Sequence, residues 1–220
     1  MRKGSYRAKG NAPHYYFSMK IPLFALGFWF VVWTASAADP VVRVTTSLGM
    51  VDIQLLPASA PNTVANFLRY VDRSPNGYNG TFIHRSAPGF IEQGGGFITS
   101  TFVDTGSSVN ATHIPTDPPV ANEFHVSNLR GTVAMAKLST DPNSATSDWF
   151  INLVDNSANL DHTNGGFTVF GRVIGNGMAV MDAIAALPRL RSMGEGIPLR
   201  NYSGGNATQA KLINVTTALL

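Results

Sequence analysis

Few side chains in this sequence have the types and spacing of a common enzyme motif. The 220 residues include no cysteine, no Gly-x-Ser-x-Gly elbow, no phosphate-binding P-loop and no His-Glu-x-x-His zinc motif. Glu123 and His125, with His113 upstream, carry atoms that bind metals, but such side chains in a polar loop are usually solvated. We therefore expect no metal, and a hydrolase is a weak hypothesis.

Another set of segments is specific when its members are taken together. They occur in the order Phe82-Ile83-His84-Arg85, Pro88-Gly89-Phe90-Ile91-Glu92-Gln93-Gly94-Gly95, Met135-Ala136-Lys137 and Ser144-Ala145-Thr146-Ser147-Asp148-Trp149-Phe150-Ile151-Asn152. Smaller matches lie at Asn122-Glu123, Arg130-Gly131-Thr132, Leu160-Asp161 and Phe167-Thr168-Val169-Phe170-Gly171. In this order and spacing the segments resemble the cyclophilin family of peptidyl-prolyl cis/trans isomerases, particularly its exported bacterial branch, from about Val41 to the C-terminus.

The resemblance implies an enzyme that rotates X-Pro bonds without a cofactor. Rotation meets a barrier of roughly 18 to 20 kcal/mol, because the nitrogen lone pair is delocalised into the carbonyl. The family assigns catalysis to the arginine at Arg85, which donates a hydrogen bond to the prolyl nitrogen of the twisted imide. It assigns substrate binding to nine more positions: Phe90, Ile91, Gln93, Ala136, Lys137, Asp148, Phe150, Leu160 and Phe167.

The resemblance also divides these positions by role. The five large apolar side chains among them form the pocket for the proline ring, and Gln93 supports the arginine and the substrate carbonyl. Backbone groups of Ala136 and Lys137 hold the peptide in an extended form. Asp148 departs from the family, which commonly has glutamine there, and a carboxylate at this position is expected to pair with Arg85 or Lys137 and to lower activity.

The elements that must position these residues are mostly short strands. Val51, Ile53 and Leu55 alternate with polar residues, which predicts a strand with one buried face. The same reasoning places Ile91 with Gln93, and Asp148 with Phe150, on one face, while Trp149 and Ile151 point into the interior. Eight strands are expected: Val41–Thr46, Val51–Leu55, Thr81–Arg85, Phe90–Gln93, Gly131–Lys137, Trp149–Leu153, Thr168–Val173 and Lys211–Thr216.

Two helices complete the expected fold. Val64, Phe67, Leu68 and Val71 fall at helical spacing after Pro61, and a second helical stripe runs from Met178 to Leu187. The segment Thr99–Glu123 has no sustained period and is expected to be a loop. The sequence thus predicts a mainly β fold, a closed eight-stranded antiparallel β-barrel capped by two α-helices, because closure removes exposed strand edges.

The first 38 residues have the three parts of a secretory signal peptide. A basic region ends at Lys20, an apolar stretch runs from Ile21 to Trp33, and small residues precede a cleavage point near Ala37. All 13 acidic residues but only 11 of the 16 basic ones follow Ala37, so the remaining chain has a net charge of −2. We expect an extension and signal at residues 1–38, beginning at Met1 or Met19, and one isomerase domain at 39–220.

These features set the expected location and partners. The mature chain is expected in the periplasm or secreted, as a monomer that binds proline-containing polypeptides and no nucleic acid. Stable membrane insertion is not expected after signal cleavage, although the apolar stretch leaves an uncleaved anchor open. Two rival functions also remain open: a proline-peptide-binding chaperone module with weak or no catalysis, and a barrel that carries a small ligand.

Overall fold

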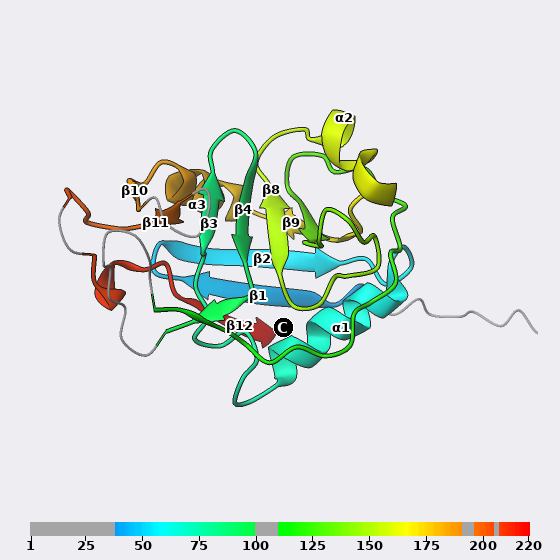
Figure 1. Ribbon diagram of the computed structural model, residues 1–220, viewed down its shortest axis with the longest axis horizontal. Coiled ribbons are helices and arrows are strands. Elements are labelled where there is room, and N and C mark those ends of the chain that lie inside the picture. The colour runs from blue at the N-terminus through cyan, green and yellow to red at the C-terminus, as the bar shows by residue number, and fades with distance from the viewer. Residues whose placement is uncertain (1–37, 100–109, 191–195, 205–206) are drawn as a thin grey trace, which may run out of the picture. The chain divides into compact units, whose positions relative to one another are not determined.

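An antiparallel sheet makes up most of the part of the chain that the structure describes. The computed structural model describes residues 38–99, 110–190, 196–204 and 207–220. Eight strands pair in the order β12-β1-β2-β9-β7-β8-β4-β3, and in Figure 1 β1 and β2 cross β3, β4 and β8, so the sheet curls. These strands are β1 (Val41–Thr46), β2 (Gly49–Leu55), β3 (Arg85–Ala87), β4 (Ile91–Gly94), β7 (Thr132–Met135), β8 (Trp149–Asn152), β9 (Val169–Ile174) and β12 (Val215–Leu219).

The sheet is a curled half-barrel, and the expectation of a closed barrel was wrong. The edge strands β3 and β12 are not paired with each other in the sheet order. Between them lies the isolated bridge from Phe82 to Asn214, flanked by the hydrogen bond from the amide of Ile83 to the carbonyl of Ile213. The strands predicted at Thr81–Arg85 and Lys211–Thr216 begin later in the structure. β3 begins only at Arg85, and Lys211 lies in a 3-10 turn before β12. A continuous ladder therefore does not form across this seam.

The first hairpin follows the alternation of its sequence. Val44 pairs with Val51, and Val42 with Ile53, and all four side chains are buried. The turn ends at Gly49, whose φ of +145° is rare for residues with a side chain, and a Cβ there would lie 2.9 Å from the side chain of Val180. Both the backbone angle and the close helix explain the glycine.

Within the described residues three α-helices accompany the sheet, one more than expected. The two predicted helices are α1 (Pro61–Asp72) and α3 (Gly177–Ala185). The third, α2 (Ser157–Leu160), has four residues, too few to show a helical period, and lies at the top of Figure 1 near β8. Within the described ranges, no helix is both long enough and apolar enough to cross a membrane.

Two short strand pairs lie outside the main sheet. β5 (Phe97–Ile98) pairs with β6 (Thr112–His113), and β10 (Arg189–Leu190) pairs with β11 (Ile197–Pro198). The first pair falls partly within the expected loop at 99–123. It places His113 opposite Phe97, close to the end of β4.

Glu123 in that loop caps α1 instead of being merely solvated. Its two carboxylate oxygens accept hydrogen bonds from the backbone amides of Asn62 and Thr63, at 3.1 and 2.8 Å. Burial opposes ionisation of Glu123, but these bonds and those from the two side chains hold its pKa below the ordinary value. A negative charge beside the first turn of α1 also interacts favourably with the helix dipole. Among the described residues no cluster of His, Cys, Asp and Glu is suited to a metal ion.

The buried apolar side chains of the described residues form three clusters, two of which lie on opposite faces of the sheet. The larger one lies inside the curl and includes Trp149, Ile151 and the rings of α1. A smaller cluster on the outer face contains Ile91, Ala134, Phe150, Leu160 and Val169. The predicted alternation along β8 is confirmed, because Trp149 and Ile151 belong to the inner cluster and Phe150 to the outer one.

The expected extension and signal peptide lie almost entirely outside the described residues. The chain divides into one unit at Met1–Ala37 and another at Ala38–Leu220, of which the structure describes only the second. The signal peptide, its cleavage and the domain boundary therefore stay predictions.

Candidate functional site

Arg85 stands at the first position of β3, on the outer face of the sheet. It pairs across the ladder with Gln93 of β4, and its Nη1 donates a hydrogen bond to Oε1 of Gln93 at 3.3 Å. Its guanidinium carbon lies 5.8 Å from the centre of the Phe90 ring. The glutamine and the aromatic ring thus restrain the guanidinium next to an apolar surface.

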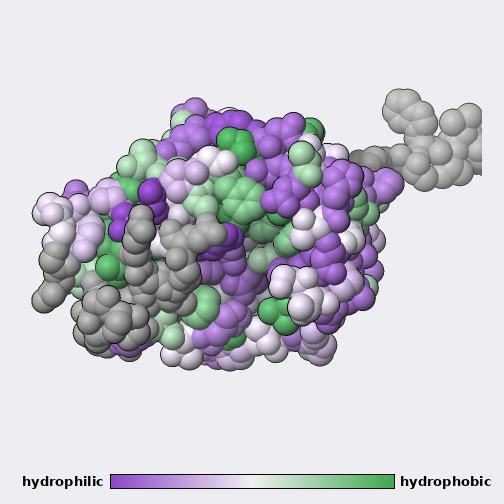
Figure 2. All heavy atoms as spheres, turned by 45° about the horizontal axis from the view of Figure 1, so that its top comes forward, coloured by the Kyte–Doolittle hydropathy of each residue, from purple (hydrophilic) through white to green (hydrophobic). Residues whose placement is uncertain are grey.

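The apolar surface is one wall of a cavity of about 260 Å³. Figure 2 shows green apolar side chains beside a hollowed region on this part of the molecule, bordered by purple hydrophilic ones. Nine of the ten sequence-predicted site residues line the cavity, and Asp148 is the exception: Arg85, Phe90, Ile91, Gln93, Ala136, Lys137, Phe150, Leu160 and Phe167. Strands β3, β4 and β8, helix α2 and the loops beside them supply these residues, which are up to 82 positions apart in the sequence.

Phe150 and Phe167 give the cavity its aromatic walls. Their ring centres lie 5.7 Å apart with the planes at 71°, an edge-to-face arrangement that aromatic pairs favour. Phe150 is buried in the sheet, whereas Phe167 is partly exposed on the segment that follows α2. A flat apolar ring such as that of proline fits between walls of this kind.

The side chain of Lys137 is hydrogen-bonded to the segment that carries Phe167. Its Nζ donates hydrogen bonds to the carbonyls of Asn164 and Gly166, each at 2.6 Å, and lies 4.8 Å from the centre of the Phe167 ring. Burial lowers the pKa of Lys137, while the carboxylate of Asp141 works in the opposite direction. The amine therefore positions the aromatic wall.

The backbone beside the cavity is partly engaged within the protein. The amide of Ala136 donates to the carbonyl of Asp148 at 2.9 Å, which extends the pairing of β7 with β8. A peptide held along residues 136 and 137 has to use other backbone groups. This binding role stays a prediction.

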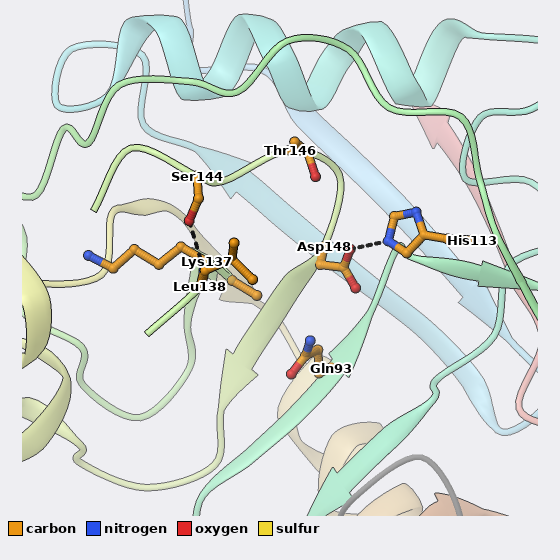
Figure 3. Close-up of a pocket in the computed structure, with 8 residues that line it drawn as sticks. Gln93, His113, Lys137, Leu138, Ser144, Thr146 and Asp148 are labelled. Carbon is orange, nitrogen blue, oxygen red and sulfur yellow. Dashed lines mark hydrogen bonds and ion pairs between the residues drawn. The ribbon is translucent and has the colours of Figure 1, made fainter. Parts of the chain in front are cut away.

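Asp148 lies in a second cavity, which adjoins the first. This cavity of about 250 Å³ shares Gln93, Ala136 and Lys137 with its neighbour and is completed by His113, Leu138, Ser144, Thr146 and Asp148. Figure 3 shows Asp148 facing His113, with the Lys137 side chain directed away from both. The expectation that Asp148 pairs with Arg85 or Lys137 was wrong. Among the described residues its ion-pair partners are His113 and His84, at 2.7 and 3.4 Å.

Two buried titratable groups lie behind the site. Burial lowers the pKa of His84 to about 4, against the opposite effect of Asp148. Burial likewise raises the pKa of Glu92 to about 8, although its hydrogen bond from Ser86 opposes this. Both groups are therefore neutral near pH 7, and the walls of the two cavities carry the ionisable side chains of Arg85, Lys137, His113 and Asp148.

Sequence reasoning missed the histidines around Asp148. His84 was seen only as part of a motif, and His113 was expected to be solvated. The contact of His113 with Asp148 depends on the pairing of β5 with β6, and the two residues are 35 positions apart. A contact between residues so far apart cannot be predicted from the pattern of neighbouring residues in the sequence.

The fold and site together define a class of protein: a curled β-sheet that presents an arginine beside an aromatic-walled cavity on its outer face. A model of the family described as cyclophilin type peptidyl-prolyl cis-trans isomerase/CLD matches residues 41–201. The chain belongs to this family, and its activity is that of a peptidyl-prolyl cis-trans isomerase.

Relatives from bacteria are similar over most of their length. A peptidyl-prolyl cis-trans isomerase of Acinetobacter baylyi is 43% identical over 154 residues, which are 69% of this chain and 74% of the relative. Peptidyl-prolyl cis-trans isomerase B of Escherichia coli is 37% identical over 160 residues, 70% of this chain and 89% of the relative.

The fold is also similar to that of a solved structure. A cyclophilin type isomerase of Cryptosporidium parvum, determined in the presence of the dipeptide Ala-Pro, aligns with a TM-score of 0.58 and 22% identity. The alignment covers 82% of this chain and 98% of the other. At this identity the likeness concerns the fold.

Proposed function

We propose that this isomerase acts on proline-containing segments of exported polypeptides, with Arg85 as its catalytic residue. The observation that carries the proposal is the single cavity in which Arg85 and eight other predicted residues meet. The proline ring lies against Phe150, Leu160 and Phe167, and the imide nitrogen lies within reach of the guanidinium. The Cryptosporidium parvum isomerase of similar fold was determined in the presence of Ala-Pro, a dipeptide with one X-Pro bond, which supports this choice of substrate.

The reaction requires a site that fits the twisted amide better than either planar form. Rotation localises the lone pair on the prolyl nitrogen, and the guanidinium then donates a stronger hydrogen bond to it. Gln93, which already accepts a hydrogen bond from Arg85, holds the donor in position. Each 1.36 kcal/mol of selective stabilisation gives about a tenfold faster reaction, so a few such contacts suffice.

Measured turnover of a proline peptide tests the catalytic role. Arg85→Ala is expected to lower kcat/KM by about 100-fold, the usual effect of removing a donor aimed at developing charge. Arg172→Ala is the matched control, because Arg172 is exposed on β9 and bonds to Gln54. If both variants keep the rate of the wild type, Arg85 is not catalytic. Peptide binding without turnover would instead indicate the chaperone module.

The proposed location rests on the sequence of the leader. A basic region, a short apolar stretch and small residues near Ala37 favour export and cleavage, and the mature chain then works as a monomer in the periplasm or outside the cell. Mass spectrometry of the protein from a periplasmic fraction tests this. A chain that keeps residues 1–37 and stays in the cytoplasm contradicts export.

A further inference from the structure

The second cavity contains a charged cluster that the isomerase reaction does not use. Asp148 projects into it from the position just before β8, with 18% of its side chain exposed, and it faces His113 of β6 (Figure 3). His84 lies on the other side of the carboxylate, 3.4 Å from Oδ1. The backbone leaves room for this carboxylate at Gly96, where a Cβ would overlap Oδ1 of Asp148. The carboxylate is thus held in a fixed place at the cavity wall.

Hydrogen-bond geometry sets the charge of His113. Its Nδ1 lies 2.9 Å from the carbonyl oxygen of Ile114, and its Nε2 lies 2.7 Å from Oδ2 of Asp148. Both neighbours are acceptors, so both ring nitrogens have to carry a proton for both bonds to form. His113 in this geometry is an imidazolium that neutralises Asp148.

His84 contributes a weaker, uncharged contact. Its side chain is buried, its Nδ1 has no hydrogen-bond partner, and its Nε2 lies 3.4 Å from Oδ1 of Asp148. Because burial holds the pKa of His84 near 4, it is neutral at physiological pH. Among the described residues Tyr78 is a further titratable group near Asp148; it is fully buried and stays neutral, since burial raises its pKa well above the ordinary value.

The remaining cation in the cavity wall is directed elsewhere. The Nζ of Lys137 is bound to two backbone carbonyls of the segment that carries Phe167. The other wall residues, Gln93, Ala136, Leu138, Ser144 and Thr146, are uncharged. When His113 loses its proton, the described wall residues therefore hold one negative charge, that of Asp148, to which none of their cations is bound.

The second cavity is placed to receive a side chain of the same peptide whose proline fills the first. The two cavities share the wall of Gln93, Ala136 and Lys137. An extended chain advances about 3.3 Å per residue, so the side chain comes from a position one to three residues from the proline. We propose that Asp148 makes the enzyme select substrates with a lysine or arginine near the proline, and that His113 competes with that cation for the carboxylate.

This inference rests on the proposed function, because it assumes that the proline occupies the first cavity. The test uses heptapeptides with a central proline and one variable residue, Lys, Gln or Glu, placed in turn at each of the three positions on either side. Nuclear magnetic resonance exchange measures catalysed cis/trans interconversion without a coupling protease, and chemical-shift titration of the same samples gives Kd. Wild type is compared with Asp148→Asn and with Asp72→Asn, which removes an exposed carboxylate of α1 that lines neither cavity.

At one register the wild type is expected to prefer Lys over Gln by roughly fivefold to tenfold in kcat/KM, and Gln over Glu. Asp148→Asn is expected to abolish this order, and Asp72→Asn to keep it. A far-ultraviolet circular dichroism spectrum like that of the wild type shows that Asp148→Asn is folded. Equal rates for Lys and Gln at every register in the wild type, or a preference that survives Asp148→Asn, overturn the inference.

The pH dependence of the preference for the Lys peptide tests the role of His113. Burial works against its charged form, but the bonds to Ile114 and Asp148 outweigh this and raise its pKa above 6.5. The Lys preference is expected to be larger at pH 8.5 than at pH 6, since lysine itself stays charged to about pH 10. In His113→Gln it is expected to be the same at both values, and an unchanged pH dependence in this variant contradicts the competition.

Failure of the proposed function gives a different result. In that case the wild type catalyses no exchange of any peptide, or Arg85→Ala is as active as the wild type. The Kd values for Lys and Gln peptides then still decide whether Asp148 selects a cation. Equal Kd values in the wild type count against it.

Discussion

The two faces of strands β4 and β8 differ in what their side chains touch. On the inner face Trp149 and Ile151 lie in the large cluster, without exposed surface. On the outer face Gln93 and Phe150 line the first cavity, and Asp148 lines the second. Alternate residues of the same short segments thus build the core and the site. The comparison indicates that inner-face changes act on stability and outer-face changes act on substrate binding.

The largest expected effect is on the inner face, at Trp149. Its ring is fully buried and meets Tyr78 edge-on, with the centres 6.5 Å apart. Trp149→Ala is expected to lower the free energy of unfolding by about 3 to 5 kcal/mol, because a large cavity replaces the indole. Urea denaturation measures this change.

Trp149→Phe is the matched control for this prediction. It keeps an aromatic ring and removes the Nε1 group, which is buried without a hydrogen-bond partner. We expect the control to lose far less stability than the alanine variant. Similar losses in the two variants would show that packing of the ring is not what Trp149 contributes.

A buried carboxyl on the same inner face gives the next prediction. Glu92 has no exposed surface, accepts a hydrogen bond from Ser86 at 2.6 Å through Oε1, and has no partner at Oε2. Burial raises its pKa from 4.5 to about 8, so the folded chain keeps a proton that the unfolded chain releases. Its contribution to stability is therefore fully present below pH 4.5 and declines as pH rises to about 8.

Glu92→Gln is expected to remove this dependence. Between about pH 5 and pH 8 the folding equilibrium constant of the wild type should fall relative to the variant by about tenfold per pH unit. Chemical denaturation at several pH values measures the difference. Glu123→Gln is a control in which stability should depend on pH in the opposite direction. The pKa of Glu123 is lowered in the folded chain, so its contribution to stability is lost only as pH falls. Parallel pH profiles of the wild type and Glu92→Gln contradict the burial of a neutral Glu92.

Local patterns predicted which face each residue occupies but not which distant groups meet. Alternation along β8 placed Trp149 inside and Phe150 outside, and the ordered motifs gathered nine residues that line one cavity. The pair formed by His113 and Asp148 depends on the tertiary position of β6, which has only two residues. The burial of Glu92 likewise depends on what covers β4.

The shape of the sheet shows the same limit. Its strands were mostly predictable from alternation, yet pairing of the two edges depends on the lengths of β3 and β12 and on the turn before β12. β3 has three residues, and the residues before it make only isolated bridges. Strand propensity does not report where a ladder stops, so a closed barrel was expected where the structure has a curled half-barrel.

The smallest expected effect on stability is on the outer face, at Phe167. Its ring is partly exposed, touches Phe150 edge-on and lies under the amine of Lys137. Phe167→Ala is expected to raise KM for proline peptides by about tenfold, because the proline ring loses one wall, and to lower the free energy of unfolding by about 1 kcal/mol or less. Phe167→Leu, which keeps apolar surface, should recover most of the affinity. A loss of stability as large as that of Trp149→Ala, with KM unchanged, would remove the distinction between the two faces, because the outer aromatic wall would then serve packing and not substrate binding.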